Sequence, residues 1–96
     1  MCEFDYWPDA DAAMDAMEAD PTMRAVLEDV ERTLDRLSAD PCDRRLGTTV
    51  FQSPELGGVS ATPTRLGDWY VFWQRSAEPG VLEVVLIHEL TAVRPS

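Results

Sequence analysis

Apolar and polar positions alternate at the start of the chain. Residues 2–7 read CEFDYW, which places Cys2, Phe4 and Tyr6 on one side of an extended segment. A period of two is typical of a half-buried strand, so the pattern predicts a strand at 2–7. Pro8 suits the first turn of a helix, and a thin stripe of alanine and methionine after it predicts a helix over 8–19.

The strongest periodic signal follows Asp20 and Pro21, a capping carboxylate and a proline at the first helical position. Apolar residues then recur at steps of three and four, which predicts an amphipathic helix over 21–39. They are Met23, Val26, Leu27, Val30, Leu34 and Leu37. The charged residues between them are expected to form a solvated face: Glu28, Asp29, Glu31, Arg32, Asp35 and Arg36.

After Pro41, turn-forming residues divide the sequence into pieces of strand length. The pieces are 48–52, 59–64, 69–75 and 81–90. The last two are rich in aromatic and β-branched residues and are joined by a short link, so we expect them to form the central hairpin. Pro63 predicts that the 59–64 piece is an edge strand or a bulged strand, because proline cannot donate to a central ladder.

These elements predict a single domain over 1–96 with an α+β fold, in which two N-terminal helices pack on a small antiparallel sheet. The expected order is β-α-α-β-β-β, with strand 2–7, helices 8–19 and 21–39, and antiparallel strands within 48–90. A chain of 96 residues is long enough for one hydrophobic core and too short for two ordinary domains.

Charge is distributed unevenly along the chain. Thirteen of the 18 acidic residues lie in the first 43 positions, and the remainder of the chain carries five acidic residues and five arginines. The net charge of −10 therefore belongs to the helical half, which disfavours binding of a polyanion there. No apolar run has the length of a membrane span, so a cytoplasmic protein that does not bind membranes is expected, with Cys2 and Cys42 as reduced thiols.

Two segments resemble the RelE/ParE superfamily of type II toxin–antitoxin systems. LDRLSADP at 34–41 is similar to the end of the second helix in that family. RLGDWYVFW at 65–73, followed by a turn and VLEVVLIHEL at 81–90, is similar to its last two strands. The resemblance implies a toxin neutralised by an antitoxin-like protein partner. Its target would be messenger RNA on the ribosome, cleaved by an endoribonuclease, or DNA gyrase, and no cofactor is implied.

The resemblance also implies site residues. A ribonuclease must stabilise negative charge on phosphorus and move protons. Tyr70 stands where many relatives carry an arginine that contacts phosphate, which leaves Arg44, Arg45 and Arg65 as candidates for that contact. The candidates for proton transfer are Tyr70, His88 and Glu89, although a lone histidine at a strand end is more often a packed residue. No metal set is expected from Cys42 and His88.

Strand alternation predicts which side chains face away from the helices. Trp69, Val71 and Trp73 are expected in the core, opposite 82, 84, 86, 88 and 90 of the last strand. The open face would carry Tyr70, Phe72, Glu83, Val85, Ile87 and Glu89. Aromatic Phe72 and Tyr70 there favour binding of a partner, an RNA target or a second copy in a homodimer. The alternative function is a non-catalytic interaction module, whose acidic helical face mimics a polyanion or docks on a basic protein.

Overall fold

A computed structural model describes residues 2–53, 57–65 and 68–89. Along the chain the elements are β1 (Glu3–Tyr6), α1 (Pro8–Ala19), the 3₁₀ turn η1 (Pro21–Met23), α2 (Arg24–Ala39), the 3₁₀ turn η2 (Arg44–Leu46), β2 (Thr49–Ser53), β3 (Gly57–Pro63), β4 (Trp69–Arg75) and β5 (Val81–Glu89). The predicted helix over 21–39 thus begins with a 3₁₀ turn, where the Asp20 side chain accepts a hydrogen bond from the Thr22 N–H at 2.9 Å.

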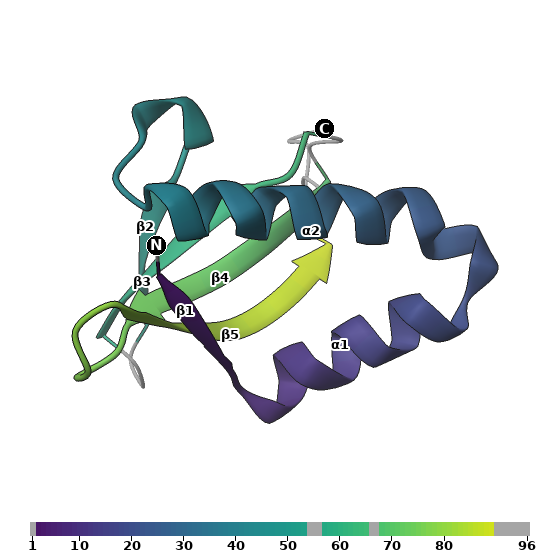
Figure 1. Ribbon diagram of the computed structural model, residues 1–96, viewed down its shortest axis with the longest axis horizontal. Coiled ribbons are helices and arrows are strands. Elements are labelled where there is room, and N and C mark those ends of the chain that lie inside the picture. The colour runs from purple at the N-terminus through teal and green to yellow at the C-terminus, as the bar shows by residue number, and fades with distance from the viewer. Residues whose placement is uncertain (1, 54–56, 66–67, 90–96) are drawn as a thin grey trace, which may run out of the picture.

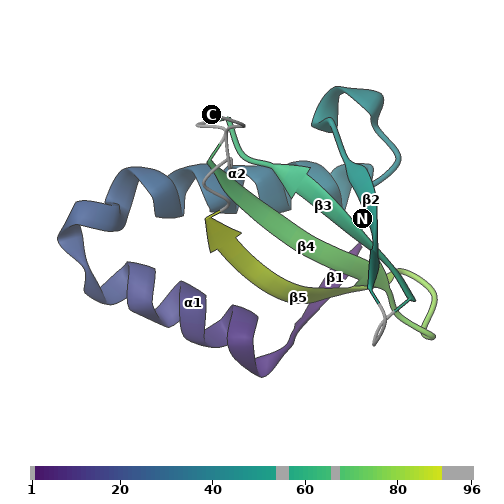
Figure 2. The ribbon, with the colours of Figure 1, turned by 180° about the vertical axis from the view of Figure 1, so that it is seen from behind.

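The strands form one sheet in the order β1-β5-β4-β3-β2, with both helices on one side of it (Figure 1). Seen from behind, β3, β4 and β5 lie in front of α2 and present the other face (Figure 2). The expected α+β class is confirmed. All four predicted pieces after the helices form strands, one more than the three in the expected order β-α-α-β-β-β. The expectation of a purely antiparallel sheet was wrong, because β1 runs parallel to β5.

The stripe of α2 packs on the sheet as predicted. Val30, Leu34 and Leu37 are buried, and Met23, Val26 and Leu27 pack partly buried against the same cluster. One expected surface residue is not at the surface: Asp29 is buried, 4% exposed, and accepts a hydrogen bond from the backbone N–H of Arg65 at 3.2 Å. This carboxylate ties α2 to the chain that follows β3.

The prediction that Pro63 marks an edge or bulged strand was wrong, because β3 lies between β2 and β4. Pro63 is the last residue of β3, and the ladder with β2 begins only at the pair Thr49–Ala61. The next residue, Thr64, donates its N–H to Trp69 O of β4 at 2.9 Å. Successive N–H groups of a strand point in opposite directions, so the missing N–H of Pro63 points toward β2 beyond the start of that ladder.

The central hairpin of β4 and β5 forms as predicted, but β5 contains a bulge. Phe72 is opposite Leu86 while Trp73 is opposite Val84, which leaves Val85 as an extra residue in β5. A bulge of one residue exchanges the two faces of the strand beyond it. Ile87 is therefore 2% exposed in the core, and the expected positions of Leu86, Ile87, His88 and Glu89 were each on the wrong face. Leu90 lies outside the described residues.

A small polar network lies within the helix-covered side of the sheet. Trp73 Nε1 donates to Thr62 Oγ1 at 2.9 Å, and Thr62 Oγ1 lies 2.7 Å from Thr48 Oγ1. Thr62 is fully buried, and its hydroxyl is the shared partner of both neighbours. The network fixes Trp73 as a core side chain, in agreement with the prediction for this residue.

Candidate functional site

Three aromatic rings from two strands form a row on the open face of the sheet. The ring centres of Phe51 and Phe72 are 6.2 Å apart, and those of Phe72 and Tyr70 are 6.4 Å apart. Both distances fit tilted aromatic contacts. Phe51 is 44% exposed, and Tyr70 and Phe72 are half-buried. We call these three residues the aromatic row.

Apolar side chains extend the aromatic row across the sheet. Phe51 is opposite Val59 of β3, and Phe72 lies between Ala61 of β3 and Leu86 of β5. In a β-bulge the extra residue and the one after it both oppose a single residue of the partner strand, so Val85 joins Leu86 beside Phe72. The open face therefore has a continuous apolar centre that runs from β2 to β5.

The bulge also brings together two of the predicted catalytic residues. His88 is the cross-strand partner of Tyr70, so both side chains leave the sheet on the open face. His88 is exposed and lies at the end of β5. Glu89 is opposite Trp69 and points to the other face, so it does not join them. The structure thus forms half of the predicted catalytic set.

Acidic groups border the aromatic row toward β1. Gln74 Nε2 donates to Glu83 Oε1 at 2.7 Å, and Glu83 is also opposite Asp5 of β1. Two carboxylates at directly opposed positions repel each other unless a cation lies between them. This side of the open face therefore favours a positively charged neighbour.

Arg65, the predicted phosphate contact, lies on the helix side of the molecule. Its backbone N–H is bound to Asp29, and its side chain borders a hollow of about 440 Å³ together with residues of α2. These are Ala25, Glu28, Asp29 and Arg32. Two of the α2 side chains are acidic, so the surroundings of Arg65 are of mixed charge rather than a cation cluster.

Arg44 and Arg45 form the turn η2, which follows the C-terminal end of α2. The Arg45 side chain donates to Asp43 through Nε at 3.1 Å and Nη2 at 3.0 Å. These side-chain hydrogen bonds, followed by one from the Arg45 N–H, lower the pKa of the Asp43 carboxyl. The same side-chain bonds, followed by the charge of Asp43, raise the pKa of Arg45. Arg45 is thus already paired with a carboxylate, whereas the exposed Arg44 appears in no ion pair of the described residues.

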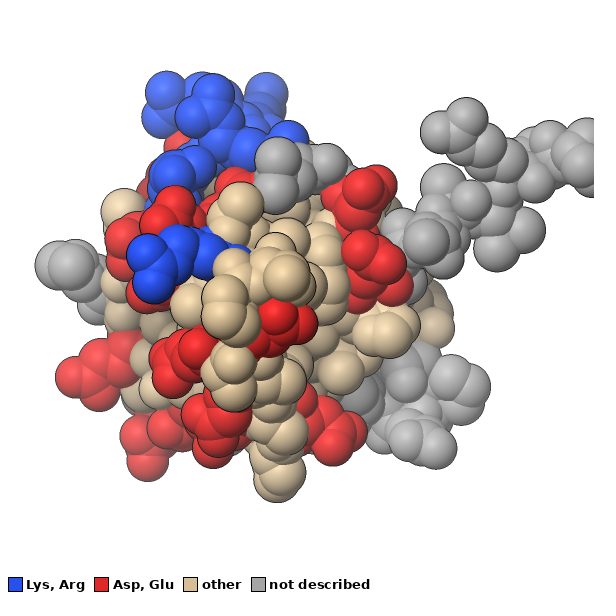
Figure 3. All heavy atoms as spheres, turned by 90° about the vertical axis from the view of Figure 1, so that its right-hand side faces the viewer, with Lys and Arg blue, Asp and Glu red and all other residues tan. Residues whose placement is uncertain are grey.

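Viewed from the side where α1 meets α2, acidic side chains cover much of the surface, and arginines gather at the level of α2 (Figure 3). The helical half is therefore acidic in three dimensions as well as in sequence. A polyanion approaching this side would be repelled over a screening length of about 8 Å at physiological ionic strength.

A second hollow was not foreseen from the sequence. It has a volume of about 370 Å³ and lies between the C-terminal half of α1 and the ends of β4 and β5. Its lining is mostly apolar: Ala13, Ala16, Met17, Asp20, Met23, Trp69, Ile87 and His88. His88, at the end of β5, therefore borders this hollow as well as being the cross-strand partner of Tyr70. The thin alanine stripe of α1 was the available signal, because small side chains leave space against a sheet.

No set of three His, Cys, Asp or Glu side chains is placed to hold a metal ion within residues 2–53, 57–65 and 68–89. In the same ranges, no helix has the length and apolar character needed to cross a membrane. In comparisons with known proteins, no family model, no curated protein and no solved structure matches the chain.

Proposed function

We propose that this chain is the RelE/ParE-like toxin component of a toxin–antitoxin pair, acts in the cytoplasm, and binds a protein partner through the open face of its sheet. The observation that carries the proposal is the aromatic row with its apolar surroundings. Exposed aromatic side chains grouped in one patch are typical of protein-binding surfaces. The arginines that a phosphate site requires lie elsewhere.

The chemistry of the open face indicates which partner it fits. The aromatic row offers apolar contact area, and Glu83 and Asp5 add negative charge at one side. A partner segment with apolar side chains followed by a lysine or arginine would satisfy both features. An antitoxin tail of this composition is the partner that we propose.

The test is growth of a host culture after tightly controlled induction of this chain, alone and together with its neighbouring gene. We expect arrest by the chain alone and relief by the neighbour. A Phe51→Ser, Phe72→Ser double variant should lose binding to the neighbour product by at least about tenfold, since each ring is a central contact. A matched Glu28→Ser, Asp35→Ser variant on the helical face should bind as the parent does.

Normal growth with verified folded expression would contradict the toxin proposal. If a basic protein then co-purified and was released by salt, the acidic helical face would be its docking surface, as in the alternative function. The degree of salt sensitivity separates the two interfaces, because apolar contacts on the aromatic row depend much less on ionic strength than an ionic contact with the acidic helices does.

A second candidate function is cleavage of messenger RNA, and the cross-strand pair of Tyr70 and His88 favours it. A phenol and an imidazole on one face are groups that move protons. Mapping messenger ends in arrested cells would detect cleavage. We expect a His88→Ala, Tyr70→Phe variant to abolish it, and an Arg65→Gln variant to leave it unchanged because Arg65 faces α2. Arrest without new messenger ends would remove this candidate.

A further inference from the structure

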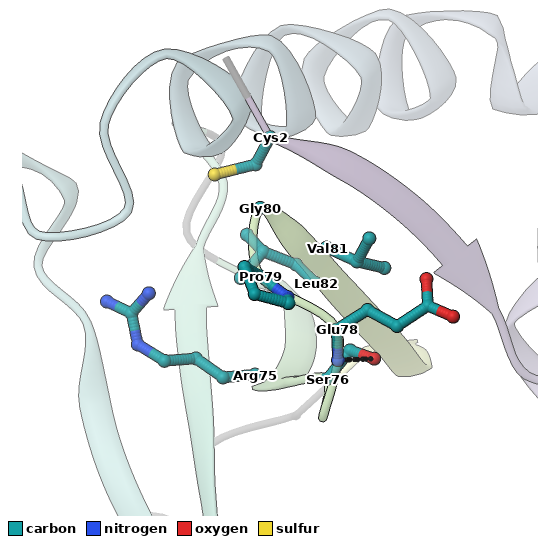
Figure 4. Close-up of a pocket in the computed structure, with 8 residues that line it drawn as sticks. All are labelled: Cys2, Arg75, Ser76, Glu78, Pro79, Gly80, Val81 and Leu82. Atoms are coloured by element: carbon teal, nitrogen blue, oxygen red, sulfur yellow. Dashed lines mark hydrogen bonds between the residues drawn. The ribbon is translucent and has the colours of Figure 1, made fainter.

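Arg75, at the end of the sheet where β4 finishes and β5 begins, contacts one cysteine of the chain and shares a hollow with the other. Arg75 Nη2 donates to Cys42 Sγ at 3.2 Å. Arg75 and Cys2 line one hollow of about 120 Å³, with the link between β4 and β5 forming its floor. Figure 4 shows the Cys2 thiol pointing toward the side of this hollow on which the Arg75 guanidinium lies.

The backbone holds Cys2 against the last turn of α2. Its N–H donates to Ser38 O at 2.8 Å, and Ser38 Oγ donates back to Cys2 O at 2.8 Å. Cys42 follows Ser38 by four residues, a span of at most about 14 Å when fully extended. The chain between them is folded, since the Asp43 N–H donates to Asp40 O at 3.2 Å. Because Cys2 is hydrogen-bonded to Ser38, the backbone keeps Cys42 within this short span of the residue that holds Cys2.

Cys42 lies in an exposed turn rather than in a helix or strand. Its N–H donates to Asp40 Oδ1 at 3.0 Å, a local contact within the turn. A disulfide needs Cα atoms within about 7 Å of each other, and exposed turns open locally more easily than packed elements do. Cys2 is held by backbone hydrogen bonds to α2, whereas Cys42 lies in the exposed turn.

Arg75 adds a positive charge beside Cys42. No ion pair of the described residues includes Arg75. Its contact at 3.2 Å places a guanidinium N–H donor directly against Cys42 Sγ, the atom that would carry the oxygen. Charge-assisted hydrogen bonds of this kind stabilise an oxyanion as it develops.

We propose that Cys42 and Cys2 form an oxidation site for hydrogen peroxide, with Arg75 as the positioning residue. The Cys42 thiolate attacks one peroxide oxygen, the O–O bond breaks, and the released hydroxide takes a proton to become water. Cys42 is then a sulfenic acid. The Cys2 thiolate attacks its sulfur, the S–O bond breaks, and the hydroxide leaves as a second water molecule. Two thiols and one peroxide thus give one disulfide and two waters.

The disulfide would join the start of β1 to the turn after α2. It closes the chain from residue 2 to residue 42, which contains β1 and both helices. Cross-links that close long segments raise the melting temperature by restricting the unfolded chain. The oxidised protein should therefore melt several degrees above the reduced protein, and a reductant should reverse the change.

The test uses the full chain at low concentration, treated with hydrogen peroxide and followed by intact mass and free-thiol count. We expect both thiols to disappear with the loss of two hydrogen masses from the monomer. A Cys2→Ser variant should stop at the sulfenic acid of Cys42, which a dimedone probe captures. An Arg75→Gln variant should react about tenfold more slowly, the effect of one charge-assisted hydrogen bond. An Arg24→Gln variant, at the far end of α2, is the matched control.

Circular dichroism of each variant checks that the fold is retained, so that a slower reaction is not a consequence of unfolding. Addition of oxygen atoms to Cys42 without loss of hydrogen masses would overturn the proposal. So would a disulfide-linked dimer as the main product, or an equal oxidation rate in the Arg75→Gln and parent proteins.

Discussion

The two faces of the sheet are formed by the same alternating strands but differ in how far their side chains are buried. Under the helices, Val71, Val84 and Leu82 are 1% exposed or less, and the polar groups among them are paired within the core. On the open face Val59 and Ala61 are buried beneath their neighbours, but the aromatic row, Val85 and Leu86 are only partly covered, and titratable groups stand among them. The helix-covered face therefore supplies most of the stability, and the open face can vary with function at little cost to the fold.

Burial of the helix side also does not extend to the edge strand β2. Val50 of β2 belongs to the helix side by register, yet it is 61% exposed, so this edge strand is little covered on that side. Phe51 on its other side is 44% exposed. An uncharged edge strand that is open on both faces is a site where another strand can add. The open face and the β2 edge thus form one accessible region.

The difference in stability between the two faces can be tested by truncating one leucine on each face of β5. Leu82→Ala should lower the free energy of unfolding by about 2–5 kcal/mol, because it leaves a cavity in the core. Leu86→Ala, on the open face beyond the bulge, should cost less than half as much. Urea denaturation measures both. Equal losses would mean that Leu86 belongs to the core, as the simple alternation of the sequence predicts.

The polar network offers the next largest effect. Thr62→Val should cost about 1–3 kcal/mol, since it leaves Trp73 Nε1 and the Thr48 hydroxyl without their shared partner. The same measurement on Thr33→Val is the control, because Thr33 Oγ1 donates only to the Asp29 carbonyl within its own helix. That variant should change stability by less than about 0.5 kcal/mol. Similar losses in the two variants would contradict the role assigned to Thr62.

A smaller effect is expected at the junction of α2 with the chain after β3. Asp29→Ala should destabilise the protein by about 1–2 kcal/mol, because the Arg65 N–H loses its acceptor. Asp35→Ala, at an exposed position of the same helix, should stay within about 0.5 kcal/mol of the parent. Thermal melts of the two variants at the same pH measure the difference. If Asp29→Ala were as stable as the parent, the hydrogen bond between Asp29 and the Arg65 N–H would not contribute to stability.

The smallest effect concerns Tyr6, at the margin of the helix-covered face. Burial, then the nearby carboxylates of Glu31, Asp11 and Asp35, raise its pKa above the usual 10.0. The folded state therefore holds this proton more tightly than the unfolded state does. The associated stability is complete below pH 10 and is lost as the pH rises through the folded pKa. The phenolate absorbance of the parent, minus that of Tyr6→Phe, should give a midpoint above 10; a midpoint below it would contradict the assignment.

The helices and the central hairpin could be predicted from the sequence, because both have a regular period over many residues. The apolar stripe of α2, the partly buried Trp69 and the buried Trp73 follow directly from this period. The central position of β3 could not, since the rule for proline depends on which neighbour its missing N–H faces. The burial of Asp29 also depends on a contact with residue 65, 36 positions away.

The candidate site was less predictable than the fold. Tyr70 and Phe72 lie on the open face as expected. Phe51 joins them because of the register between β2 and β3, which the sequence pattern does not give. The three candidate arginines were grouped in the prediction by chemistry alone, and the structure separates them: Arg44 and Arg45 lie in η2, and Arg65 lies in the chain after β3. Side chains on separate elements meet or separate according to tertiary packing, which local patterns do not encode.

The extra residue in β5 bears on how such a surface can change by mutation. Substitutions alter one side chain at a time, whereas deletion of one residue at Val85 would exchange every later position of the strand between the two faces. His88 would then enter the core and Ile87 would leave it. Among proteins of this shape, a change of one residue in strand length is thus a single genetic step that replaces a whole set of exposed groups, with no change in the residues themselves.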